Sequence, residues 1–367
     1  MTFARWTFAG FVALSGCSSG SGGSDTGAKN PATAPTATAT TAPTGTATTA
    51  PTGTATTAPD GAATAAPTGT ATTPPTGSTS AQTAIGPIPL QAGEEKTVCI
   101  VKKLPNDQDI VVSNITADLA PGSHHLIVST TADTVENLTP TPCQTFSSIL
   151  MGQTKPLIIV NTPHGVQTFP SGVGVLVPAH QMVRLEGHYL NSSTSAIEGA
   201  GTVTFNGVLA AQSPAYQAAN TYVWGTAKIS LAADATFTTP VVFQAGMPDT
   251  HILSITTHEH RLGTLVQAWT SSAPGAKDEM LANDANWSEP TWKMLDAPYD
   301  MNGTNGLSLQ CSWNNTTSDT ITFGESALQE MCFLIGFYYP SHGLDVCIDG
   351  FCIERQKQDG GTPAPSQ

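Results

Sequence analysis

The residues with the clearest chemical potential lie in the stretch Ser-Ile-Thr-Thr-His-Glu-His-Arg-Leu-Gly, residues 254–263, where two histidines flank one residue at the end of an apolar run. On an extended strand, residues i and i+2 point to the same face, so His258 and His260 can present two imidazoles to one metal ion. Imidazole is a ligand for zinc, copper, iron and nickel. The alternative is a half-exposed strand that carries polar residues at alternate positions.

A second candidate is the adjacent pair His124-His125, which begins the apolar run that ends at Val128. Neighbouring residues on a regular strand point to opposite faces, so they can share a metal ion only at a strand start or a bulge. Pro121-Gly122 supplies such an irregularity just upstream; otherwise one histidine is buried and one exposed. His188, late in another apolar run, is a structural residue by default and becomes a candidate ligand only beside a distant pair.

Met331 opens the apolar run that ends in Tyr338-Tyr339, so its default role is core packing. A thioether is, however, a soft ligand that favours Cu(I). Together with His258 and His260, Met331 would form a site of two nitrogens and one sulfur that can bind and activate dioxygen.

Charge and the N-terminal residues restrict the class of protein. The 367 residues carry 13 Lys and Arg against 27 Asp and Glu, a formal charge of -14, which argues against nucleic acid as a partner and favours cations near the surface.

Arg5 and the short apolar run 6–14 predict an export signal, and the tetrad Leu-Ser-Gly-Cys that ends at Cys17 resembles a bacterial lipobox. We expect a lipid on Cys17 and, with Ser18, sorting to the outer membrane, facing the periplasm or the cell surface; an ordinary cleaved signal is the alternative.

The rest of the chain divides by composition. Residues 1–17 are the expected signal, and 18–84 form a Thr/Ala/Pro repeat of eight residues that lacks the apolar surface needed to fold and serves as a disordered spacer. From there on, short apolar runs alternate with Gly, Pro, Asn and Ser, which predicts an all-β chain of two antiparallel jelly-roll or β-sandwich domains, 85–212 and 213–355. A disordered tail, 356–367, follows.

Six cysteines remain beyond Cys17, and an even number in an exported chain suggests disulfides. Fifteen complete pairings are possible from the sequence alone.

Taken together, these pieces resemble the copper type II, ascorbate-dependent monooxygenases, over about Val98 to Pro340. The His-His pair, the His-Tyr near the end of the first half, the His-x-His-x-x-Gly run and the Glu-Met-Cys followed by Tyr-Tyr-Pro occur in family order. The resemblance implies two jelly-roll domains, each with one copper, separated by a solvent-filled gap. The first copper would receive an electron from ascorbate, and the second would bind oxygen where a substrate C–H bond is broken; their implied ligands are His124, His125 and His188, and His258, His260 and Met331.

The resemblance also implies the disulfides Cys99–Cys143 and Cys311–Cys332, and it leaves Cys347 with Cys352 to close a small C-terminal loop. The chain departs from the peptide-amidating branch at three positions. Thr256 replaces an arginine that binds the substrate carboxylate there, and Phe333 and Ile335 replace an asparagine and a tyrosine. A peptide carboxylate is therefore not the expected substrate.

The leading hypothesis from the sequence is an exported, lipid-anchored copper monooxygenase. It would hydroxylate a C–H bond of a small organic substrate with O2 and a reductant such as ascorbate. One alternative is a copper-binding surface lipoprotein without turnover. Another is a zinc hydrolase, which Met331 disfavours as a poor zinc ligand and which lacks a placed general base.

Overall fold

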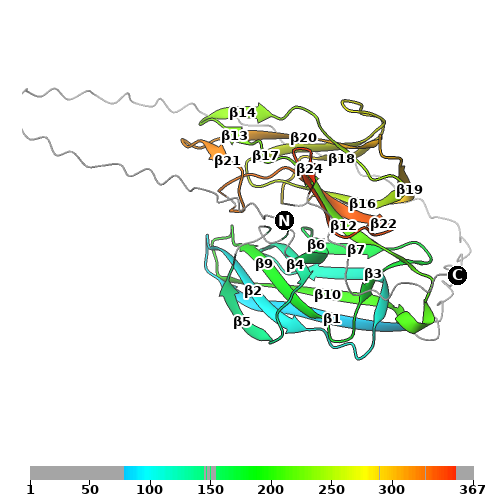
Figure 1. The fold of residues 1–367 in the computed structure, drawn as a ribbon. Helices are drawn as coiled ribbons and strands as arrows, with labels where there is room; N and C mark the ends of the chain where they lie inside the picture. The colour runs from blue at the N-terminus through cyan, green and yellow to red at the C-terminus, as the bar shows by residue number, and fades with distance from the viewer. Residues whose placement is uncertain are drawn as a thin grey trace, which may run out of the picture. The chain divides into compact units, whose positions relative to one another are not determined.

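The computed structural model describes residues 78–143, 146, 149, 154–288, 290–326 and 328–352. The expected signal with Cys17, most of the spacer and the C-terminal tail lie outside these residues. No helix in the described part of the chain is long and apolar enough to cross a membrane. Figure 1 shows that this part is built almost wholly from strands, as the alternation of apolar and polar residues predicts.

The first lobe, defined here as β1–β11, consists of two sheets. One sheet has the strand order β1-β10-β3-β8-β11, with β7 paired to β3, and the other has the order β5-β2-β9-β4-β6. Its strands are β1 (Ser78–Leu90), β2 (Glu95–Lys103), β3 (Ile110–Leu119), β4 (Ser123–Thr130), β5 (Asn137–Pro142), β6 (Lys155–Val160), β7 (His164–Thr168), β8 (Val173–Val177), β9 (Met182–Leu190), β10 (Ile197–Leu209) and β11 (Gln217–Ala218), with a short 3-10 turn η1 (Ala210–Gln212) before β11.

The second lobe, β12–β24, has a six-stranded sheet in the order β19-β16-β22-β12-β23-β24. Its five-stranded sheet has the order β14-β20-β17-β18, with β15 paired to β20, and β13 pairs with β21. Its strands are β12 (Asn220–Gly225), β13 (Ser230–Leu231), β14 (Ala235–Thr238), β15 (Val242–Ala245), β16 (Thr250–His258), β17 (Gly263–Ser271), β18 (Met280–Asp284), β19 (Trp292–Met301), β20 (Gly306–Asn315), β21 (Ile321–Thr322), β22 (Phe333–Tyr339), β23 (Asp345–Ile348) and β24 (Phe351–Cys352).

Two expected boundaries need correction. Strand β1 begins at Ser78, so the spacer does not extend to residue 84; Ala81 and Thr83 already alternate into the core opposite β10. At the other boundary, the chain does not leave the first lobe at residue 212, because Gln217–Ala218 still pairs with β8. The second lobe starts with β12.

The two lobes repeat one corner. In the first lobe, Asn191 Nδ2 donates to the carbonyl oxygens of Leu90, Gln91 and Ser195. In the second lobe, Asn315 Nδ2 donates to those of Leu231, Ala232 and Asp319. Both asparagines are fully buried, and each Oδ1 accepts a hydrogen bond from the backbone N–H two residues later. The same local solution therefore closes a strand end in both halves.

The lobes contact each other directly, which corrects the expectation of a solvent-filled gap. One apolar cluster takes Ile127 and Ile159 from the first lobe and Val223, Phe333 and Ile335 from the second, all fully buried. The lobes are also joined by a hydrogen bond from the Thr256 hydroxyl to Asn161 Oδ1. Burial of these β-branched and aromatic side chains against each other is favourable, whereas a water-filled gap would leave them exposed.

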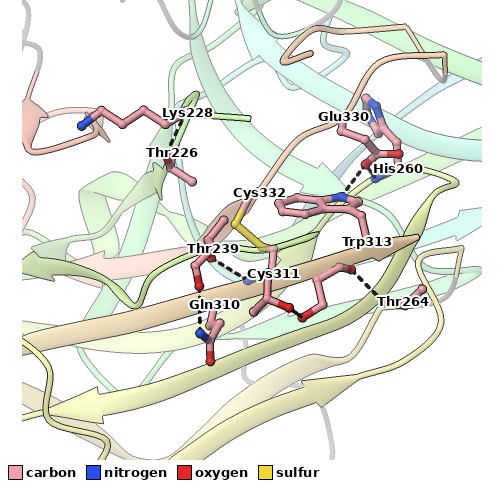
Figure 2. Close-up of a disulfide and its surroundings, with 12 residues drawn as sticks. Thr226, Lys228, Thr239, His260, Thr264, Gln310, Cys311, Trp313, Glu330 and Cys332 are labelled. Atoms are coloured by element: carbon pink, nitrogen blue, oxygen red, sulfur yellow. Dashed lines mark hydrogen bonds between the residues drawn. A yellow bond between two sulfur atoms is a disulfide. The ribbon is translucent and has the colours of Figure 1, made fainter. Parts of the chain in front are cut away.

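Three disulfides lie in the described residues, with the pairing that the resemblance implies. Cys99 is bonded to Cys143, and Cys347 to Cys352. The third, Cys311–Cys332, joins β20 to the segment just before β22 (Figure 2).

Candidate metal centre

The first histidine set, His124, His125 and His188, comes from two neighbouring strands. His125 pairs directly with His188 across β4 and β9, and the register shifts between Ser123 and His125. This irregularity follows Gly122, whose φ of +81° lies in the left-handed region. It breaks the normal alternation, so both adjacent histidines turn to the same place. The bulge that the sequence required for a shared site is thus present.

The rings of the first set surround one point. Their centroids lie 5.3 Å apart for His124 and His125, 5.3 Å for His124 and His188, and 4.9 Å for His125 and His188. One ring nitrogen from each of the three lies within 4.8 Å of the others. With metal–nitrogen bonds of about 2.0 Å, two imidazoles that share one ion at a tetrahedral or trigonal angle have centroids roughly 5 Å apart. The three side chains therefore fit one ion.

The second histidine set consists of His258 and His260. His258 is the last residue of β16 and pairs with Phe333 of β22, while His260 lies just beyond the strand. Their ring centroids are 5.1 Å apart. The i, i+2 spacing predicted that both imidazoles could reach one ion, and the structure brings them together at that separation.

The two sets adjoin across the lobe boundary. The centroid of His258 lies 6.1 Å from that of His124 and 5.9 Å from that of His125, and His260 lies 6.4 Å from His124. These separations exceed the roughly 5 Å expected for rings on one ion. The geometry therefore fits two neighbouring ions rather than a single ion with five ligands.

All five imidazoles are buried, with exposed fractions between 1% and 9%. Burial is the main cause that lowers the pKa of His124 to about 3 and that of His260 to about 4, and it lowers the pKa of His125 and His258 well below the usual value. These four rings are therefore neutral at pH 7, the form that binds metals.

Among the residues that the structure describes, several of their nitrogens find no hydrogen-bond partner: His124 Nε2, both nitrogens of His125, His188 Nδ1 and His258 Nε2. A buried polar atom without a partner is unfavourable. Metal ions would satisfy these nitrogens, and copper accepts both imidazole and thioether ligands.

Hydrogen bonds orient two of the rings. His188 Nε2 lies 2.9 Å from a carboxylate oxygen of Glu95, which leaves the buried Nδ1 for a metal ion. His260 Nδ1 lies 2.9 Å from the carbonyl oxygen of Gln329 and can donate to it, which leaves Nε2. An acceptor behind a ligating histidine sets its tautomer and its ring orientation.

Met331 is fully buried just before β22, whose first residue, Phe333, pairs with His258. Met331 also belongs to the apolar cluster that contains Phe146, whose ring lies 5.3 Å from that of His258. Core packing and metal binding are therefore compatible roles for this side chain.

Two aromatic residues that sequence reasoning missed border the imidazoles. The ring centroid of Phe146 lies 5.5 Å from that of His125 and 5.3 Å from that of His258, so Phe146 borders both sets. Trp287 belongs to the second lobe and is partly exposed; its ring centroid lies 5.1 Å from that of His124 in the first lobe. Neither carries a local sequence signal, because each contact depends on segments that are distant in the chain.

Buried acids lie next to the second set. Burial, together with Glu330 and Asp284 nearby, raises the pKa of Glu259 to about 9, so Glu259 is a neutral carboxylic acid at pH 7. Its carboxyl group covers Gly263, where a Cβ would lie 2.1 Å from Glu259 Cδ. In this conformation, Glu259 fills the space that a side chain at position 263 would occupy.

The three departures from the peptide-amidating branch are used for packing. Thr256, Phe333 and Ile335 are all fully buried, and Thr256 pairs with Ile335 across β16 and β22. The Thr256 hydroxyl donates to Asn161 Oδ1 of the first lobe. These positions therefore join the lobes.

Two solved structures match much of the chain at low similarity. The STIV MCP matches 71% of this chain and 96% of its own at 9% identity and a TM-score of 0.32. The major capsid protein P2 from bacteriophage PM2 matches 71% and 97% at 10% identity and a TM-score of 0.29. Likeness at this level carries no inference about function.

Sequence comparison is more specific. The human protein described as "Putative DBH-like monooxygenase protein 2" is 26% identical over 107 residues, which make up 28% of this chain and 21% of the human protein. Residues 228–357 match the family described as "Copper type II ascorbate-dependent monooxygenase, C-terminal domain". This match includes the second histidine set and Met331. The second lobe is therefore related to the C-terminal domain of the copper type II ascorbate-dependent monooxygenases.

Proposed function

We propose that this protein is a copper monooxygenase that hydroxylates a C–H bond of a small organic substrate with O2. The observation that carries the proposal is the pair of adjoining, buried histidine sets with unpartnered nitrogens. His124, His125 and His188 would hold one copper, and His258, His260 and Met331 the other. Copper at these sites would supply one-electron redox chemistry and a place for dioxygen to bind.

The stoichiometry of hydroxylation defines which reactants and electrons must reach the site. The substrate C–H and O2, with two electrons and two protons, give the alcohol and one water. Ascorbate or a similar reductant is the proposed source of electrons, and the short separation between the two sets favours transfer from one to the other. Phe146 and the apolar cluster exclude bulk water from the second set, and Glu259 holds a proton on its carboxyl group beside it.

We further propose that the protein is exported and held at a bacterial outer membrane through a lipid on Cys17. The three disulfides support an oxidising compartment, because such bonds are rare where thiols are kept reduced.

Metal analysis and oxygen uptake test the proposal. We expect two copper ions per chain and ascorbate-dependent O2 consumption that rises with a turned-over substrate, the product carrying one atom from 18O2. His258→Ala should abolish turnover. His164→Ala is a matched control, since His164 is exposed and its Nδ1 lies 2.7 Å from Asp118 Oδ1. Copper without product over a broad substrate panel would indicate a copper-binding lipoprotein, and about one zinc with no copper would favour a hydrolase.

A further inference from the structure

Glu330 is a buried acid whose hydrogen bonds converge from separate parts of the second lobe. Its side chain is fully buried. Oε2 accepts hydrogen bonds from the His260 backbone N–H and from the Trp313 indole N–H, both at 2.9 Å, and Oε1 accepts one from the Leu262 N–H at 2.9 Å. Figure 2 shows the carboxylate between the Trp313 ring and His260.

These contacts connect the two segments that carry the second candidate site. His260 and Leu262 belong to the turn that follows β16, and Glu330 directly precedes Met331. A buried N–H that lost its acceptor on Glu330 would be left without a partner, which is unfavourable. The side chain of Glu330 therefore holds the backbone of His260 against the segment that presents Met331.

Other contacts make this arrangement rigid. The Gln329 carbonyl accepts from the His260 ring, and Cys332 is bonded to Cys311 of β20, the strand that also carries Trp313. Glu330 thus lies in the segment before β22, and its carboxyl group is bonded both to the Trp313 indole of β20 and to the histidine turn. A metal site needs its ligands placed to within a few tenths of an ångström.

We propose that Glu330 is a positioning residue that sets the placement of His260 relative to Met331 in the second site. It acts through these two residues and does not contact the metal ion. The inference rests on the proposed function, because it assumes that the second set binds copper. A purely structural role for Glu330 would instead lower stability and leave any folded molecules with both sites intact.

Glu330→Gln tests the proposal, since it keeps the side-chain shape but points an amide N–H2 at one or more of the three N–H donors. We expect copper affinity at the second set to fall about 10–100-fold, the range for loss of a group that orients a ligand. The first set should be unchanged. X-ray absorption of the Cu(I) protein should lose its sulfur contribution. Asp345→Asn is the matched control: Asp345 is equally buried and accepts from the Trp224 indole N–H at 3.1 Å.

Glu330→Asp provides a second test if Glu330→Gln does not fold. It keeps a carboxyl acceptor but withdraws it by one methylene, so it should shift the second-set affinity in the same direction. Wild-type affinity at both sites with the sulfur contribution retained, in either folded variant, overturns the positioning role alone. A wild-type protein that binds no copper overturns the proposed function and the positioning role with it.

Discussion

Asn161 tests whether the two lobes pack in solution as they do in the structure. It follows β6 in the first lobe and is 1% exposed. Its Nδ2 donates to the Thr257 carbonyl at 3.0 Å, and its Oδ1 accepts from the Thr256 hydroxyl at 3.3 Å. Both partners belong to β16, directly before His258. Asn161→Ala therefore removes the polar bridge at the point where the histidine sets meet.

The magnitude follows from the atoms left without partners. A buried polar group that loses its partner costs about 1–3 kcal/mol. The Thr256 hydroxyl also lies 3.5 Å from the Thr257 carbonyl and can partly replace the lost bonds. We therefore expect the free energy of unfolding to fall by roughly 3 kcal/mol, which corresponds to roughly 5 °C in melting temperature for a folded part of about 270 residues.

Urea unfolding measures the stability change, and electron paramagnetic resonance of the Cu(II) protein measures the contact between the sets. The wild type should show dipolar coupling between two ions, and Asn161→Ala should weaken it. Asn315→Ala is the matched control, because it removes three hydrogen bonds of a fully buried side chain inside the second lobe. It should destabilise the protein and preserve the coupling. A change below about 0.5 kcal/mol for Asn161→Ala would refute the lobe packing.

Three further outcomes are expected. Met331→Ile keeps an apolar side chain of similar volume, so it should lower the free energy of unfolding by less than about 1.5 kcal/mol while it abolishes turnover. Met301→Ile, in the core of the second lobe, is the control and should retain activity. An active Met331→Ile would remove the sulfur ligand from the proposal. An ordinary histidine site loses copper to protons below about pH 6.5. The pKa of His260 is lowered to about 4, so protons compete with copper for this ring only near pH 4. Equilibrium dialysis should find copper retained at about pH 5, and loss of copper already between about pH 6.5 and 5.5 would show solvated rings. Copper should quench the fluorescence of Trp287, and Trp287→Phe should remove that quenched component; equal quenching in the variant would place the aromatic ring elsewhere.

The proximity within each of the two histidine pairs could be predicted because its signals are local. His258 and His260 share a face because their spacing matches the strand period. The neighbouring His124 and His125 needed a strand irregularity, which Gly122 just upstream indicates. His188 carried no signal of its own, and only the pairing of β4 with β9 places it opposite His125. The disulfide pairing came from a resemblance, since fifteen pairings satisfy the cysteine count.

The groups that hold the ligands could not be predicted. Glu95, Gln329 and Glu330 act on histidines that are about 70–93 residues away in the chain. Which of several acids or carbonyls meets a given imidazole depends on strand order and register. Neither property is visible in the local alternation of apolar and polar residues.

By itself, the sequence determined the β-rich architecture, the repeat segment before it and the two histidine pairs whose rings can meet, because these follow from short-range periodicity and from side-chain chemistry. Only the tertiary structure decided that the two histidine sets adjoin. A strand pattern shows that a face is apolar but not which face it meets, and here Ile127 and Ile159 meet Phe333 and Ile335 across the lobe boundary. The packing of these side chains, with Asn161 beside them, replaces the expected gap by contact.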